Sequence, residues 1–216
     1  MRNVFQYEPP RLLQNLTYGL MMLGYLVWLE SHGQSAWMWA LDTWGLFGSF
    51  VGLGFAFYLG WFWAVALPYL LLDHYRRPGW LYQFKIQIRR DGSASPVDFE
   101  KLWHTVRVVL FNQFFGTLPV LLLVFPLMVW RGMDPAQVAP PWFEVLWHLA
   151  VMLLVEEILF YVVHRALHHK YLYARIHKVH HEYKESIAIT THYVHYLEHI
   201  FGNLMPIFAG ALIVGA

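Results

Sequence analysis

The sequence predicts an all-α integral membrane protein with about four to five transmembrane helices and a histidine-rich metal site at the cytosolic face. Hydrophobic residues make up 58% of the 216-residue chain, and charged residues only 13%, against about 25% in soluble domains. The apolar residues form long uncharged runs of the length that crosses a bilayer. Nine of the 13 histidines fall within residues 164–199.

Five apolar runs are the expected spans: residues 12–29, 43–72, 108–130, 142–163 and 200–216, of which only the fourth contains charged residues. The first is near the lower limit for a span, which needs about 20 residues. We interpret it as a retained helix rather than a signal peptide, because no clear small-residue cleavage site follows it. The second exceeds one perpendicular span and is expected to tilt or to begin as an interfacial turn. Pro119 and Pro126 predict kinks in the third.

The positive charges predict the orientation of these spans. Residues 1–11, 73–107 and 164–199 hold 14 of the 15 lysines and arginines. An even number of spans separates these segments, so they lie on one side of the membrane, and the positive-inside rule makes that side cytosolic. Within the polar segment, residues 82–88 alternate weakly, as a short strand or a surface loop would, and Ser95-Pro96 predicts the start of a helix.

The strongest chemical signal is the spacing of five histidines. His164 and His168 are four residues apart, and His177, His180 and His181 are three and four apart, so each set shares one face of a helix. Two such faces opposed can enclose one metal ion or a pair, since neutral imidazole suits zinc, copper, iron and nickel. The chain has no cysteine, which excludes thiolate ligands. We therefore predict metal binding by these five histidines.

Other candidates leave alternatives open. His195 and His199 repeat the four-residue step, and Glu198 beside them could orient a ligand. Glu157 lies seven residues before His164 on the same helix face, where it either serves the site or forms a helix contact within the membrane. No firm ligand role is predicted for the remaining histidines, His32, His74, His104, His148, His169 and His192.

The histidine region resembles the fatty acid hydroxylase superfamily, which includes sterol desaturases and methylsterol monooxygenases. The resemblance covers about residues 142–210 and rests on VEEILFYVVHRALHH (155–169), YARIHKVHHEY (173–183) and YVHYLEH (193–199). His164 and His168 match the first histidine box of the family, and His177, His180 and His181 match the second. His195 matches a further histidine, predicted as a sixth metal ligand, although Tyr196 stands where the family usually has proline.

The resemblance implies a non-haem di-iron oxygenase, with zinc as the other metal that such a site accepts. It implies hydroxylation or desaturation of a lipid, either a sterol methyl group or a fatty acyl chain, with dioxygen and electrons from NAD(P)H. The electron donor would be a b-type cytochrome and its reductase, and a eukaryotic protein would lie in the endoplasmic reticulum membrane. No nucleic-acid partner is expected, because the net charge is only +1.

The resemblance also predicts a division of the chain. Residues 1–141 form an N-terminal membrane-spanning region, and residues 142–216 a fatty acid hydroxylase-like domain. Family members carry another histidine box further on, so we expect this domain to be C-terminally incomplete. The alternative function is a truncated, inactive member acting as a binding or regulatory membrane protein. Bis-histidine haem ligation needs paired histidines inside spans, whereas these lie mostly at the expected helix ends.

Overall fold

The protein is helical throughout the part that its computed structural model describes, residues 11–82, 99–134, 140–184 and 186–215. These ranges contain helices and short connections but no strand, which confirms the predicted all-α class. The expected strand or loop at residues 82–88 lies almost entirely outside the described residues, and so does the expected helix start at Ser95.

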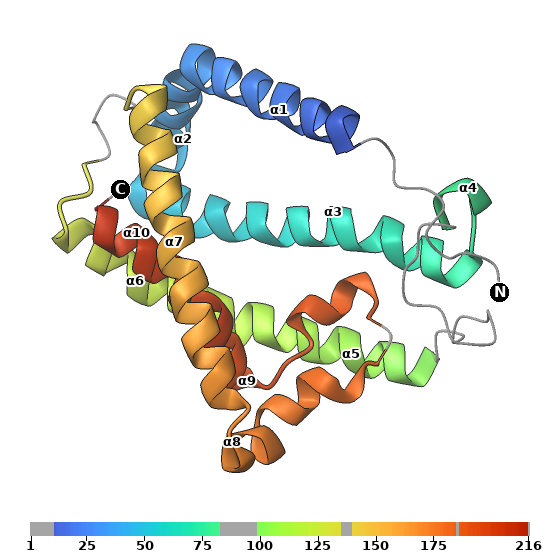
Figure 1. Ribbon diagram of the computed structural model, residues 1–216. Coiled ribbons are helices and arrows are strands. Elements are labelled where there is room, and N and C mark those ends of the chain that lie inside the picture. Colours follow the sequence, from blue (N-terminus) through green and yellow to red (C-terminus); the bar gives the residue numbers. More distant parts are fainter. Residues whose placement is uncertain (1–10, 83–98, 135–139, 185, 216) are drawn as a thin grey trace.

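The N-terminal half is a series of helices joined end to end (Figure 1). The helix Gln34–Phe47 bends at Gly45, which has a positive φ of 67°. Glycine adopts this conformation without steric cost. The elements are α1 (Arg11–Trp28), η1 (Leu29–Gly33), α2 (Gln34–Phe47), η2 (Gly48–Leu53), α3 (Gly54–Tyr75) and α4 (Gly79–Tyr82).

The C-terminal half contains the long helix α7, which crosses the other helices steeply (Figure 1). Before it come α5 (Phe99–Phe111), η3 (Asn112–Thr117) and α6 (Leu118–Trp130). The elements from α7 onward are α7 (Trp142–Leu167), α8 (Lys170–Arg175), η4 (His177–Glu182), η5 (Ala188–His192), α9 (Tyr196–Glu198), η6 (His199–Leu204) and α10 (Met205–Val214). Of these, η3 and η6 are π-helical turns and η4 and η5 are 3₁₀ helices.

Within the described residues, four helical stretches are long and apolar enough to cross a membrane, which confirms the predicted membrane class. They are Ser31–Tyr75, Glu100–Trp130, Trp142–Leu167 and Tyr196–Val214. The first expected span forms α1 but is not among the four. Large apolar side chains such as Leu153, Leu154 and Ile158 are exposed on α7, as expected for a surface that faces lipid.

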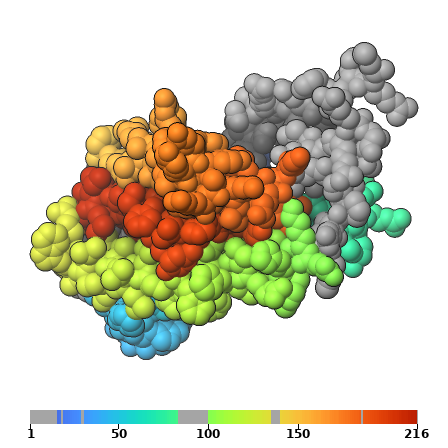
Figure 2. Space-filling view, turned by 90° about the horizontal axis from the view of Figure 1, so that it is seen from below, coloured from blue at the N-terminus to red at the C-terminus, as the bar shows by residue number. Residues whose placement is uncertain are grey.

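The packing places the chain after η4 against two membrane helices. Ala66 of α3 packs with the buried Ile187 and Ile189, and Leu102 and Val106 of α5 pack against the same cluster. Figure 2 shows the red C-terminal segment lying between the orange α7–α8 region and the green α5–α6 region. The histidine-bearing segments are therefore fixed from both sides by spans.

The close approach of α10 to α7 depends on a glycine. A Cβ atom on Gly210 would lie 2.8 Å from the Cα atom and 3.0 Å from the carbonyl oxygen of Met152. Because backbone atoms cannot move aside individually, any larger residue at this position must separate the two helices.

We expect Gly210→Ala to lower the free energy of unfolding by about 1–3 kcal/mol, the usual cost of overpacking. Thermal unfolding of the detergent-solubilised protein measures the change. Gly60→Ala is the matched control, because a Cβ at that position meets no heavy atom within 4 Å. Equal melting temperatures for the two variants would show that this helix contact does not limit stability.

Candidate metal centre

Two separate elements carry the five predicted histidines. His164 lies in the last turn of α7 and His168 caps its C-terminal end. The short helix α8 then turns the chain back, so that η4 brings His177, His180 and His181 against the end of α7. The second set lies on a 3₁₀ helix rather than the expected α-helix, and in a 3₁₀ helix residues three apart align.

The five imidazole rings form one cluster, as the spacing predicted. The ring of His177 is central, with its centroid 4.6 Å from those of His164 and His168, 4.7 Å from that of His181 and 5.4 Å from that of His180. Nitrogen atoms of His164, His168 and His177 all lie within 4.8 Å of one another. The cluster thus brings ring nitrogens from both elements to one place.

The nitrogen spacing fits ligands of a shared metal ion. The Nε2 atoms of His164 and His168 are 3.3 Å apart, and those of His177 and His181 are 3.0 Å apart. A metal–nitrogen distance of about 2.1 Å puts neighbouring ligand nitrogens about 3.0 Å apart in an octahedral shell and about 3.4 Å apart in a tetrahedral one. In addition, Nδ1 of His180 is buried without a hydrogen-bond partner among the described residues. A nitrogen that is available to coordinate a metal ion would have this environment.

The environment favours the neutral form of His177 and His180, the form that metal binding requires. Burial, reinforced by the neighbouring histidines, lowers the pKa of His177 to about 4. Burial also lowers the pKa of His180, with His181 as the next contribution. Near neutral pH both rings therefore carry a free nitrogen lone pair.

A buried carboxylate orients the central histidine. Oε1 of Glu198, at the end of α9, lies 2.8 Å from Nδ1 of His177, and both side chains are buried. Accepting a hydrogen bond from Nδ1 fixes the ring so that Nε2, the nitrogen nearest His181, carries the lone pair. Glu157, the other candidate considered from the sequence, is exposed. The carboxylate that the structure brings to the cluster is thus Glu198.

His195 lies apart from this cluster. Its Nδ1 accepts a hydrogen bond of 3.2 Å from the backbone N–H of Leu197 and so caps α9. Its ring lines a cavity between α5 and the segment before α9, and in the described part of the chain it makes no ring contact with the five histidines. The predicted ligand role of His195 stays a prediction.

Polar contacts attach the end of η4 to α5. Nζ of Lys101 donates to the carbonyl oxygen of Glu182 at 3.1 Å, and the Thr105 and Tyr183 hydroxyls are 2.6 Å apart. The hydroxyl of Tyr193 donates to the Glu182 carboxylate at 2.7 Å. None of these partners stands out in the sequence, because each contact except the last joins residues about eighty positions apart.

A second buried polar group holds the turn that follows Glu198. Oγ1 of Thr117 lies 2.9 Å from Nε2 of the fully buried His199. The Asn112 side chain donates to the carbonyl oxygens of His192 and Val194 at 3.0 and 2.9 Å. His199 lies four residues after His195. Through Thr117 it therefore joins the two π-helical turns η3 and η6.

Comparisons with known proteins place the histidine region in a recognised group. The family model described as fatty acid hydroxylase matches residues 149–216. The chain is 36% identical over 156 residues to fatty acid hydroxylase domain-containing protein 2 of Homo sapiens, covering 72% of this chain and 46% of that protein. Over 149 residues it is 38% identical to fatty acid hydroxylase ahd1 of Mycosarcoma maydis, covering 68% and 38%.

The name of a further relative refers to a sterol substrate. Methylsterol monooxygenase 1 of Rattus norvegicus is 34% identical over 127 residues, covering 56% of this chain and 42% of that protein. The chain thus spans less than half the length of these relatives. No solved structure matches it.

We expect acid to destabilise the metal-free protein. Histidine in an unfolded chain has a pKa of about 6.5, whereas burial lowers the pKa of His177 in the fold to about 4. The unfolded state therefore binds more protons than the folded state between these pH values. The contribution of a neutral His177 to stability is therefore complete above pH 6.5 and is lost toward pH 4, by up to about 3 kcal/mol. Thermal unfolding with chelator from pH 7.5 to 4.5 measures it. His177→Gln should remove this contribution, so that its melting temperature falls less in acid than that of the variant with exposed His74→Gln. Equal falls in the two variants would contradict the lowered pKa of His177.

Glu198→Gln should weaken metal binding about 10–100-fold, because a neutral amide supports the His177 ring less strongly than a carboxylate does. Competition with a chromophoric chelator measures the affinity. Glu157→Gln makes the same chemical change at an exposed position on α7 and should leave the affinity within about twofold. The reverse order of effects would assign the orienting carboxylate to Glu157.

Proposed function

Because residues 149–216 belong to the fatty acid hydroxylase superfamily, we propose that the protein is a membrane-bound non-haem di-iron oxygenase that hydroxylates or desaturates a lipid. The observation that carries the proposal is the cluster of five imidazoles at the ends of apolar spans. A site of this kind places oxidising chemistry where an apolar substrate can reach it without leaving the bilayer. Sterol methyl groups are the first substrate class, and long acyl chains are the second.

The residues that would hold the metal are His164, His168, His177, His180 and His181, with His195 as a predicted sixth. Their donors are all imidazole nitrogens, which suit iron and also accept zinc. When bound, iron would supply the activation of dioxygen that attack on an unactivated C–H bond requires. In a hydroxylation, the substrate, dioxygen, two electrons and two protons give the alcohol and water.

The other groups of the chain would prepare the site. The Glu198 carboxylate would hold the Nδ1 proton of His177 and keep the ring in one tautomer. A cavity of about 560 Å³ adjoins His180 and is lined on its apolar part by Leu72 and Leu81 and by Ile187. This cavity would admit the reacting carbon of a lipid while its apolar wall excludes water.

The expected electron donor is a b-type cytochrome with its reductase, approaching from the cytosol. Four exposed cationic side chains follow His168 closely in the chain: Lys170, Arg175, Lys178 and Lys184. A cationic surface beside the cluster favours an acidic partner and speeds its encounter. It also suits the side of the membrane that the positive-inside rule makes cytosolic, in the endoplasmic reticulum for a eukaryotic protein.

The test uses the natural protein that contains these residues, reconstituted in lipid with ferrous iron, a reductant and labelled dioxygen. We expect a lipid product that retains one labelled oxygen atom, or an oxygen-dependent new double bond, detected by mass spectrometry. His177→Ala should lower the rate at least about 100-fold, because it removes the central ligand. His169→Ala is the control, since His169 is exposed and does not face the cluster.

Metal content separates the main proposal from its alternative. Two metal ions per chain with turnover of a sterol or acyl lipid supports the oxygenase. One ion or none, without an oxygen-dependent product from any sterol or ceramide pool, would reject it in favour of a binding or regulatory protein.

A further inference from the structure

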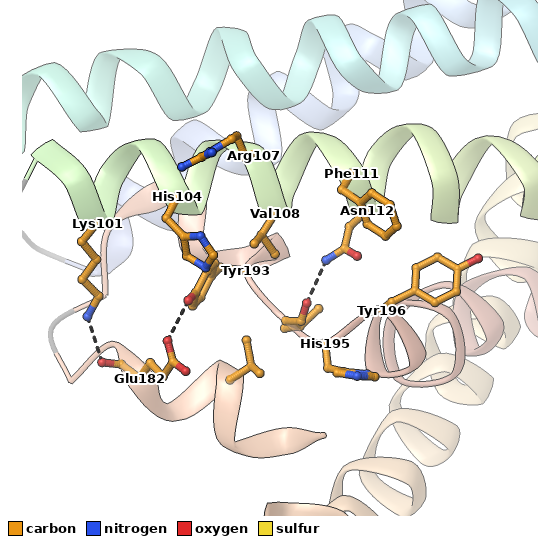
Figure 3. Close-up of a pocket in the computed structure, with 12 residues that line it drawn as sticks. Lys101, His104, Arg107, Val108, Phe111, Asn112, Glu182, Tyr193, His195 and Tyr196 are labelled. Atoms are coloured by element: carbon orange, nitrogen blue, oxygen red, sulfur yellow. Dashed lines mark hydrogen bonds between the residues drawn. The ribbon is translucent and has the colours of Figure 1, made fainter. Parts of the chain in front are cut away.

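A second cavity lies between α5 and the segment from η4 to α9. Its volume is about 810 Å³, and Figure 3 shows the side chains of α5 above it and those of Tyr193, His195 and Tyr196 opposite. Val179 and Glu182 of η4 also line it. The cavity uses none of the five clustered histidines.

One end of the cavity is cationic. Lys101, His104 and Arg107 all line it, and their spacing of three residues puts them along one side of α5. Lys101 is held by the carbonyl oxygen of Glu182, and the guanidinium of the exposed Arg107 lies 6.0 Å from the ring of Trp103. The carboxylate of Glu182 is engaged by the Tyr193 hydroxyl. Nζ of Lys101 also lies over the Tyr183 ring. Among the described residues that line the cavity, two permanent positive charges therefore stand beside one carboxylate.

The other end is mainly apolar, with His195 and Asn112, whose amide is bonded to backbone carbonyls, as its polar members. Val108 and Phe111 of α5 face Val194 and Tyr196 across the cavity, as Figure 3 shows for the labelled residues Val108, Phe111 and Tyr196. From Lys101 to Phe111 the helix rises about 15 Å, which is half the thickness of the hydrocarbon core. Because α5 begins the span Glu100–Trp130, the cationic end lies at the membrane boundary and the apolar end reaches toward the lipid tails.

We propose that this cavity binds one membrane lipid with an acidic headgroup, the headgroup at Lys101, His104 and Arg107 and a tail along Val108 and Phe111. The cationic end disfavours a neutral or zwitterionic headgroup, since neither neutralises two positive charges. The apolar end disfavours a small soluble anion, which would leave that surface uncovered. Both ends together fit an amphiphile lying across the interface.

The proposal does not require oxygenase activity, although His195, the predicted sixth metal ligand, also lines this cavity. A lipid in this cavity contacts Val179 and Glu182, which belong to the 3₁₀ helix that carries three of the clustered histidines. Binding is therefore expected to stabilise η4 whether or not a metal is bound.

The experiment titrates the purified chain, with chelator present, in a neutral detergent. The probes are dioleoyl phosphatidic acid, dioleoyl phosphatidylcholine, oleic acid and inorganic phosphate, and the readouts are native mass spectrometry and thermal unfolding. We expect an acidic lipid to bind at one per chain at least tenfold more tightly than phosphatidylcholine and to raise the melting temperature. Tighter binding of phosphatidic acid would assign a phosphate headgroup, and tighter binding of oleic acid a carboxylate; either result supports the proposal.

Arg107→Gln should weaken acidic-lipid binding about tenfold, the usual effect of losing one charge-assisted contact. This position is preferred to Lys101, whose contact with Glu182 also supports the fold. Lys170→Gln, an equal change of charge at an exposed site on α8, should leave the affinity unchanged. Equal effects of the two variants, equal binding of phosphatidylcholine, or equal protection by inorganic phosphate would overturn the proposal.

Discussion

The hydrogen bond between Glu198 and His177 is the constraint on which the rest of the site depends. It joins the start of the last span to the 3₁₀ helix η4 through two side chains that are both buried. A carboxylate buried without a partner would cost several kcal/mol. The fold therefore stabilises only those arrangements in which the last span and η4 meet, and the same meeting sets the orientation of the central imidazole.

Helix contacts within the membrane determine where that carboxylate lies. The π-helical turn η3 packs against η6, and a Cβ on Gly116 would come within 2.7 Å of Cδ2 of His199. Only glycine permits this approach, which brings Oγ1 of Thr117 into hydrogen-bonding distance of His199. Because His199 directly follows Glu198, the polar contact between the spans also positions the carboxylate of the site. Helix packing and the geometry of the histidine cluster are thus coupled through two adjacent residues, Glu198 and His199.

The sequence predicted what is local in the chain. The spacing within His164–His168 and within His177–His181 is a property of one helical turn, so periodicity predicted which of these rings share a face. The choice of Glu198 over Glu157 depends on a contact across 21 positions, which no periodicity encodes. The same holds for His195, whose four-residue spacing to His199 suggested a shared role. In the structure the His195 ring caps α9, whereas the His199 ring contacts Thr117.

The histidine cluster is only partly buried. His177 is fully buried, whereas His168 and His181 are exposed among the described residues, so the imidazoles cover the site from one side only. In the proposed two-metal centre, five nitrogens would give each ion fewer than three donors on average, whereas a complete shell needs at least four. Such a centre would need further donors on the open side. In such a centre, metal loading would depend on the groups that occupy the open side. The number of bound ions would therefore report on the completeness of the centre more directly than the fold does.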